Sequence, residues 1–390
     1  MAGKVKVALI AGAMYEPLYR SLEEFGAARR VTVEVGYSGD HPALNAHLAS
    51  MSNPPYDLIS THTKYAPSQA HFLAPLQTRI SQEELADFYP KLLELATIDG
   101  QLLGLARNID VRLLHYRTDL MVGPPQTWDE LFDTAQKLTR GKDLYGFAFP
   151  GMESGLFGTF FELAESAGAY LFPENGIPDI VNEGGRWALR LLRRMHTSGT
   201  VPPQVVDWHY DEVHRAFREG HVAMIGDWPA YYRAHLDPAR SSVYDRFAVS
   251  AYPIGPSGAS KTYGGSHTFA LTHRGAANPG AVDLLHFLTS PERQMEEASR
   301  GSVPVRRSVM RQVRESASAK ELDRWHTLES VIDTSVLIPP KLKRYPEIEE
   351  VLWCTVQRAI VGAISEEEAL NSIVSQIAAI ARNERTLSPC

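Results

Sequence analysis

The segment spanning residues 216–228, AFREGHVAMIGDW, holds the side chains best suited to recognition chemistry. Its pattern predicts the end of a helix, a stop at Gly220, an apolar strand over residues 222–225, and then Asp227 and Trp228. Ligands of open α/β sheets bind outside the carboxyl ends of the strands. A carboxylate beside a flat apolar ring suits a sugar, whose hydroxyls form hydrogen bonds and whose C–H face stacks. We therefore predict ligand contact here; the alternative is a capping aspartate beside a core tryptophan.

Other polar and aromatic residues follow predicted strands and are further candidates for ligand contact. Alternate residues of a strand share a face, which groups residues 108, 110 and 112. A Gly-Gly pair lets a ligand approach the backbone closely. The alternatives are structural: a helix cap at residue 40, or an ion pair between residues 110 and 112. The predicted contacts are Tyr15, Glu16, Asp40, His62, Thr63, Asn108, Asp110, Arg112, Glu153, Tyr231, Gly264, Gly265, Ser266, His267 and Arg306.

Length and composition narrow the class of protein. A chain of 390 residues exceeds what one hydrophobic core usually supports, so two lobes are expected. The net charge of −7 argues against nucleic acid as a partner, and no segment approaches the roughly 20 apolar residues of a membrane span. We find no nucleophile elbow, P-loop, Gly-x-Gly-x-x-Gly, His-Glu-x-x-His or Cys-x-x-Cys pattern. His209 and His214 are five residues apart, which does not suit a helical metal site, so we expect no metal, no cofactor and no enzyme.

Strand-like and helix-like segments alternate along the chain. Strands are predicted at residues 5–10, 31–37 and 56–60, with helices between them. Capping boxes open further helices at residues 81–84 and 127–130. This alternation favours an α/β architecture built on parallel strands.

A series of motifs, in order along the chain, is similar to family 1 of the extracellular solute-binding proteins, the receptors of ABC importers. The segment at 216–228 resembles the family's signature around a Gly-x-Trp. Residues 124–131, PPQTWDEL, are close to a literal copy of a second motif of the family. Each motif is weak alone, and the ordered set is specific. The remaining matches are DGQLLGL at 99–105, LLHYRTDL at 113–120, YPIGP at 252–256, FLTSPE at 287–292 and VPVR at 303–306. The chain departs from the family's pattern at two positions: Ala106 stands where proline is usual, and His267 follows the Gly-Gly pair. Both departures bear on which ligand is bound and not on the membership of the family.

The resemblance implies a type II periplasmic binding protein fold, in which two α/β lobes close around a ligand in a cleft between them. The N-terminal lobe should comprise residues 1–112 and about 270–313. The C-terminal lobe should comprise about 113–265 and 318–390. Hinge segments are expected near residues 109–117, 261–271 and 313–319.

The resemblance also implies a function: binding a mono- or oligosaccharide and delivering it to an ABC permease, as a monomer. One alternative is the same kind of receptor for a glycerophosphodiester or another charged polyol. A second is a two-lobed carbohydrate-active enzyme using Asp227 and Glu153. The resemblance places the protein outside the cytoplasm, in the periplasm or as a cell-surface lipoprotein. No signal peptide is visible, since the apolar run at residues 7–13 lacks a cleavage site, so a leader is expected to have been removed.

Overall fold

The computed structural model describes residues 3–12, 15–173 and 177–385, and it divides into two compact units. Unit 1 is Met1–Asp110, Gly265–Ala317 and Pro340–Tyr345; unit 2 is Val111–Gly264, Ser318–Pro339 and Pro346–Cys390. The short stretch Pro340–Tyr345 therefore groups with unit 1, although the sequence placed it with the C-terminal lobe. No helix in the described ranges has the length and apolar character needed to cross a membrane.

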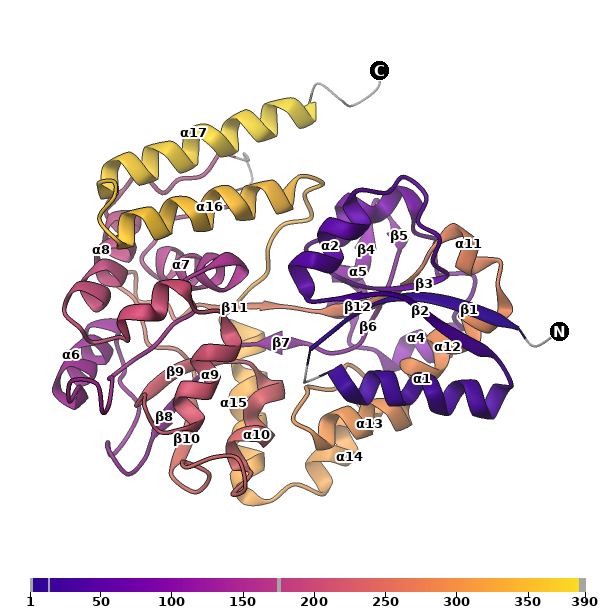
Figure 1. Cartoon of the computed structure of the whole chain (residues 1–390), viewed down its shortest axis with the longest axis horizontal. Helices are drawn as coiled ribbons and strands as arrows, with labels where there is room; N and C mark the ends of the chain where they lie inside the picture. Colours follow the sequence, from indigo (N-terminus) through magenta and orange to yellow (C-terminus); the bar gives the residue numbers. More distant parts are fainter. Residues whose placement is uncertain (1–2, 13–14, 174–176, 386–390) are drawn as a thin grey trace. The chain divides into compact units, whose positions relative to one another are not determined.

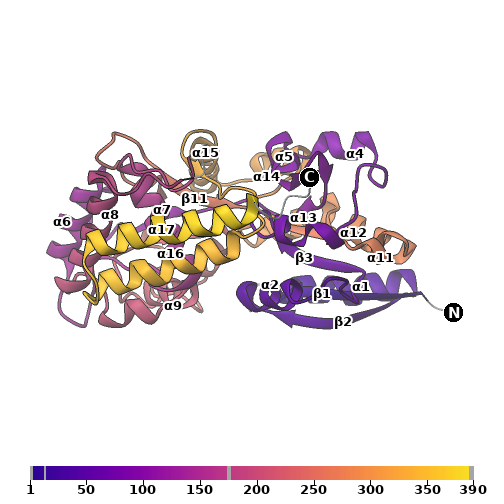
Figure 2. The ribbon, with the colours of Figure 1, turned by 90° about the horizontal axis from the view of Figure 1, so that it is seen from above.

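Unit 1 is built on a five-stranded sheet in the order β2-β1-β3-β12-β6. Strand β1 runs parallel to β2 and β3, whereas β12 is antiparallel to β3 and β6. Helix α1 packs on β2, and helix α2 packs on β1 and β2, at the end of the sheet that these two strands form (Figure 2). The strands are β1 (Lys4–Ile10), β2 (Thr32–Gly39), β3 (Leu58–His62), β6 (Leu105–Ala106) and β12 (His267–Leu271).

The helices of unit 1 begin where the sequence indicates. The predicted helix at residues 16–28 is α1, and the Ser81 hydroxyl accepts from the backbone N–H of Glu84 at the start of α4. A short hairpin joins β4 (Thr97–Ile98) to β5 (Gln101–Leu102) across the predicted Asp-Gly turn. The helices are α1 (Glu16–Arg29), α2 (His41–Ala49), α3 (Ala66–Gln69), α4 (Gln82–Asp87), α5 (Pro90–Ala96), α11 (His273–Ala276), α12 (Pro279–Leu288), α13 (Pro291–Ser299) and α14 (Arg307–Glu315).

Unit 2 has a three-stranded sheet, β10-β8-β9, whose strands pair antiparallel, so the prediction of parallel strands holds for part of unit 1 and not for these three strands. The capping box at Thr127 and Glu130 is formed in both directions. Helices α16 and α17 run side by side, and α17 packs on α8 (Figure 1). The elements are β8 (Leu113–Arg117), β9 (Met224–Asp227), β10 (Phe247–Ser250), α6 (Trp128–Leu138), α7 (Glu153–Ser166), α8 (Glu183–Thr197), α9 (Tyr210–Arg218), α10 (Tyr232–Leu236), α15 (Ala319–Thr334), α16 (Tyr345–Ile360) and α17 (Glu366–Arg385).

A third small sheet, in the order β13-β11-β7, contains two of the strands at which the chain passes from one unit to the other. The chain passes within β7 (Asp110–Val111) and within β11 (Thr262–Gly265). Strand β13 (Val336–Leu337) pairs in parallel with β11. These passages fix which predicted site residues belong to which unit.

Candidate functional site

Five rings gather at one edge of the unit 1 sheet; we call Tyr15, His41, His62, Tyr65 and His267 the histidine–tyrosine cluster. The three imidazoles lie 4.9 to 5.1 Å apart between ring centroids. Tyr15 meets His267 edge-on at 6.1 Å, and Tyr65 meets His41 edge-on at 5.0 Å.

The topology of unit 1 explains why residues so distant in sequence meet. Tyr15 follows β1, His41 follows β2, and His62 ends β3. These three strands are parallel, so their carboxyl ends share one edge of the sheet. Strand β12 is antiparallel to β3, and its first residue, His267, pairs with His62 at that same edge. Tyr15, His62 and His267, three of the predicted contacts, therefore lie together, and ligand contact by them stays a prediction.

Charged groups surround the histidine–tyrosine cluster. The Arg107 guanidinium lies 5.1 Å from the Tyr15 ring centroid and pairs with Glu297 at 2.7 Å. The Lys64 ammonium lies 4.8 Å from the centroid of Tyr65. Asp110 accepts a hydrogen bond of 2.8 Å from the Asn108 amide.

Burial keeps two imidazoles of this cluster, those of His62 and His267, neutral. It lowers the pKa of His267 to about 3, helped by the nearby charges of Arg107 and Lys64, and it lowers the pKa of His62 well below its usual range. Burial likewise raises the pKa of Asp110 to about 7. A neutral imidazole has one donor and one acceptor nitrogen; in His62 the Nδ1 already accepts from the Lys64 N–H at 3.2 Å, which leaves the Nε2–H as a donor for a hydroxyl.

Several other predicted contacts of unit 1 have structural roles. Ser266 is fully buried, and its hydroxyl donates to the Asn108 carbonyl at 2.7 Å. The Ser266 N–H also donates to the Thr63 hydroxyl at 3.4 Å. A Cβ at Gly265 would lie 2.4 Å from the His62 ring, so this glycine makes room for the histidine. Its neighbour Gly264 is buried in β11.

Three predicted contacts of unit 1 lose their support. The Asp40 carboxylate accepts from the Ala43 N–H and caps α2, which was its structural alternative. Glu16 is exposed in the first turn of α1. Arg306 is buried, donates to the Thr289 carbonyl at 2.7 Å and pairs with Glu84 at 2.8 Å, so its guanidinium is already satisfied within the unit.

In unit 2 the half-buried Trp228 is the centre of a second group, the tryptophan–tyrosine cluster, which also contains Tyr210, Tyr252 and Tyr263. The Trp228 ring lies 5.3 Å from Tyr210 and 5.8 Å from Tyr263. The Arg112 guanidinium lies 5.7 Å from the Trp228 centroid and 5.9 Å from those of Tyr210 and Tyr252. Trp228 is therefore packed on one side without being a core residue.

Arg112 pairs with a residue that the sequence did not indicate. Its Nε donates to Glu162 at 3.0 Å, and both side chains are 1% exposed. Burial is the largest single effect and disfavours the charge on Arg112, but the attraction of Glu162 together with that of Tyr252 and Tyr210 raises the pKa of the guanidinium. The expected structural pair between Asp110 and Arg112 is wrong, because the acid bound to Arg112 lies on α7.

Asp227 faces the interior of unit 2, and the prediction of ligand contact for this carboxylate loses its support. It is the last residue of β9, not a loop residue, and it is 2% exposed. One carboxylate oxygen accepts from the Trp228 N–H at 2.8 Å, and the other lies 2.7 Å from the Nε2 of His235.

The two remaining predictions of unit 2 lie at helix starts and turns. The Tyr231 hydroxyl donates to Asp211 at 2.7 Å, and its ring lies 3.9 Å from that of His214. Glu153 begins α7 with a left-handed backbone, at a φ of 50°, and is partly exposed. Neither geometry assigns a ligand to these residues.

The structure adds residues that the sequence reasoning passed over. His41 follows a capping aspartate and was passed over as part of that cap. Lys64 and Tyr65 lie in the same polar loop as His62, which was the available signal for them. Arg107 and Glu162 carried no local signal, because their partners are distant in sequence.

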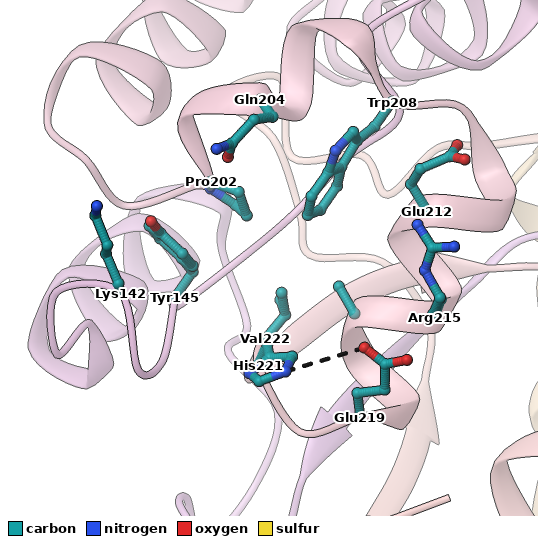
Figure 3. Close-up of a pocket in the computed structure, with 11 residues that line it drawn as sticks. Lys142, Tyr145, Pro202, Gln204, Trp208, Glu212, Arg215, Glu219, His221 and Val222 are labelled. Carbon is teal, nitrogen blue, oxygen red and sulfur yellow. Dashed lines mark ion pairs between the residues drawn. The ribbon is translucent and has the colours of Figure 1, made fainter. Parts of the chain in front are cut away.

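A separate hollow of about 310 Å³ lies on unit 2, on the outward side of α9 (Figure 3). Trp208 and Tyr145 line it together with the charged side chains of Glu212, Arg215 and Glu219. None of the predicted contacts is among its lining residues in the described part of the chain. A second hollow of about 300 Å³, on unit 1, also lacks them among the described residues.

A profile of the family described as bacterial extracellular solute-binding protein matches residues 21–322. A binding protein of Brucella abortus (strain 2308) is 26% identical over 251 residues, covering 63% of this chain and 60% of the relative. The match thus spans less than two thirds of that protein's length. A Deinococcus radiodurans protein described as an ABC transporter-binding protein is 23% identical, covering 79% of this chain and 76% of the relative.

Solved structures of similar fold cover nearly the whole chain. A maltose-bound T. maritima protein has a TM-score of 0.88 at 23% identity, covering 97% of this chain and 100% of its own. A Thermotoga lettingae ABC transporter solute-binding protein bound with α-D-tagatose has a TM-score of 0.86 at 21% identity, with the same coverage. An Agrobacterium radiobacter K84 solute-binding protein in complex with ribitol has a TM-score of 0.85 at 19% identity, covering 97% and 98%. These likenesses confirm the predicted α/β fold with two units.

Proposed function

Because this chain belongs to the family of bacterial extracellular solute-binding proteins, we propose that it binds a mono- or oligosaccharide, or a polyol, and delivers it to the permease of an ABC importer. The three proteins of similar fold hold maltose, tagatose and ribitol, according to their descriptions. The Deinococcus radiodurans relative is described as an ABC transporter-binding protein. These descriptions support the class of ligand and the transport partner.

The observation that carries the proposal is the setting of Trp228. Its indole is half-buried and braced by Tyr210, with Arg112 and Glu162 forming a buried ion pair beneath this group. A braced ring loses little conformational freedom when a ligand stacks on it. The C–H face of a pyranose or of an extended polyol matches such a ring in shape and polarity.

The histidine–tyrosine cluster of unit 1 offers polar groups that suit hydroxyls. Its neutral imidazoles and the Asn108 amide combine donors and acceptors, as hydroxyl groups require. Asp110 adds a carboxyl group whose pKa, about 7, lets it act as donor or acceptor. We propose Tyr15, His41, His62 and His267 as contacts on this unit.

We propose binding without catalysis. The enzyme hypothesis used Asp227 and Glu153 as a carboxylate pair, but Asp227 is buried and bonded to His235. A general acid must reach the atom that it protonates. Incubating a sugar with the protein and measuring its mass afterwards tests this directly, since an enzyme would change the mass.

A charged polyol is the second candidate, and the cations at the unit 1 cluster favour it. Arg107 and Lys64 both lie beside tyrosines of that cluster. A phosphodiester would interact with either cation by a charge-assisted hydrogen bond. This is the same receptor class with a different ligand.

The family is extracellular, and we infer that this protein acts outside the cytoplasm as a monomer, either free or lipid-anchored. Its partners would then be a small ligand and a permease, with no nucleic acid.

Isothermal titration with maltose, tagatose, ribitol and a glycerophosphodiester tests the proposal. At about −0.3 kcal/mol per non-hydrogen atom, a disaccharide of roughly two dozen atoms reaches about −7 kcal/mol, a low-micromolar Kd. Heat from a sugar or polyol would support the proposal. Binding of the phosphodiester alone would replace it with the second candidate. If a folded protein gives no heat with any ligand of a wide panel, both candidate functions are contradicted.

A further inference from the structure

Three titratable side chains unused by the proposed function meet inside unit 2: His214 on α9, Asp227 at the end of β9, and His235 on α10. One nitrogen of each imidazole and one carboxylate oxygen all lie within 4.8 Å of one another. The side chains come from three elements, and none is more than 8% exposed. We propose that they form a buried site for one divalent transition-metal ion of the zinc type.

The first argument is the unsatisfied polar atoms of this trio. The Nδ1 atoms of His214 and His235 are buried and have no hydrogen-bond partner within the described part of the chain. A buried polar atom without a partner costs free energy, so native structures rarely keep one without a reason. The Nε2 of His235 faces Asp227, and the unpartnered Nδ1 atoms show that the described protein groups leave the hydrogen bonding of both imidazoles incomplete.

The second argument is the chemistry of the buried donors. Imidazole nitrogens and a carboxylate oxygen are common zinc ligands, and zinc would take the place of the proton now shared between the His235 Nε2 and Asp227. The Asp227 carboxylate is likewise buried, and a bound cation would offset the cost of keeping it charged there.

The third argument is reach. Zinc–nitrogen and zinc–oxygen bonds of about 2.0–2.2 Å place ligand atoms roughly 3.4 Å apart in a tetrahedral site. The observed limit of 4.8 Å exceeds this by an amount that side-chain rotation can close. Asp227 and His235 already lie 2.7 Å apart, so His214 has the longer distance to move.

The donor set favours one class of ion. Two imidazoles and one carboxylate suit Zn²⁺, Co²⁺ or Ni²⁺, whereas Ca²⁺ and Mg²⁺ prefer sites made of oxygen alone. A third imidazole, His115, lies 5.4 Å from His235 between ring centroids, and its Nε2 is also buried without a partner among the described residues. His115 is therefore the nearest further nitrogen donor for such an ion.

Equilibrium dialysis of the EDTA-stripped full chain against Zn²⁺, followed by metal analysis, tests the site. We expect one zinc per chain, and a weakening of at least about a hundredfold in Asp227→Asn and in His214→Ala. Two control variants should retain the wild-type affinity. His221→Ala removes an exposed histidine of unit 2, and His62→Ala removes one from the histidine–tyrosine cluster.

Circular dichroism checks that each variant is folded. If His214→Ala does not fold, the visible spectrum of Co²⁺ bound to the wild type replaces it, because a four-coordinate nitrogen and oxygen site absorbs strongly. The same spectrum in His221→Ala and His62→Ala would support the buried trio as its source. A wild type that retains no zinc, or that loses it equally in His62→Ala, would overturn the proposal and leave a purely hydrogen-bonded histidine–carboxylate cluster.

Discussion

The Arg112 guanidinium and the Glu162 carboxylate form an ion pair inside unit 2 in which each side chain is only 1% exposed. The same carboxylate accepts from the Tyr263 N–H at 2.7 Å, so one acid links Arg112, which lies beside Trp228 in the tryptophan–tyrosine cluster, to β11. Removing one partner of a buried pair leaves an uncompensated charge.

Glu162→Ala should therefore destabilise the protein by about 3–5 kcal/mol, measured by urea unfolding. The matched control is Glu183→Ala, which breaks an exposed pair with Arg190 and should cost less than about 1 kcal/mol. Equal effects of the two substitutions would mean that the burial of the Arg112 pair has no energetic consequence.

Trp228→Ala should weaken ligand binding by about 2 kcal/mol or more, roughly thirtyfold, because the indole is the proposed stacking surface. Its control is Trp208→Ala, a partly exposed tryptophan of the same unit that lines the hollow in Figure 3. Calorimetry and thermal unfolding should be run on both. If Trp228→Ala binds normally but unfolds at a much lower temperature, the indole is structural and the site lies elsewhere.

Asp110 should make the free energy of unfolding fall as the pH rises, which is the opposite of the usual effect of a carboxyl group. Its pKa is about 7 when folded and near 3.8 in the unfolded chain, so the folded state holds a proton that the unfolded state has released. Stability from this group is present at low pH and lost as the pH rises from about 4 to about 7. Asp110→Asn removes the titration, so its stability relative to wild type should increase by up to about 1.4 kcal/mol per pH unit across that window.

Urea unfolding of both proteins at several pH values between about 4.5 and 8.5 measures this difference. Asparagine keeps an acceptor for the Asn108 amide, so the hydrogen bond does not confuse the comparison. Two curves that stay parallel over the whole range would show that Asp110 titrates alike in both states.

Gly265→Ala should destabilise unit 1 by about 1–3 kcal/mol and weaken ligand binding, because a Cβ there would lie 2.4 Å from the His62 ring. Gly123→Ala is the control, since a Cβ at that exposed glycine meets no atom within 4 Å among the described residues. A Gly265→Ala variant with wild-type stability would mean that His62 rotates away without cost.

Local sequence patterns predicted the helix starts well, because a cap involves residues only three apart. Thr127 and Glu130 form the predicted box, and α1 begins at the predicted residue. The site was harder, since its contacts join distant positions. Nothing near Arg112 indicated that its partner lies 50 residues away on α7.

Asp227 shows how a small shift changes a role. Strand β9 ends at residue 227 instead of 225, which makes the aspartate part of the sheet rather than of a loop beyond it. Its partners, His214 and His235, are 13 and 8 residues away and match no metal or catalytic motif. Trp228, one residue later, keeps the partial exposure that the sequence reasoning required.

The position of Trp228 also gives this protein an optical signal of its own. Trp128 and Trp325 are almost completely buried, at 2% and 3% exposure, so their emission should stay constant while the core is intact. The half-buried indole of Trp228, beside Tyr210 and a guanidinium, has surroundings that a stacked ligand would dehydrate. Its fluorescence would then follow ligand occupancy without any dye, and Trp228→Phe would remove that part of the change while the signals of Trp187, Trp208 and Trp353 remain.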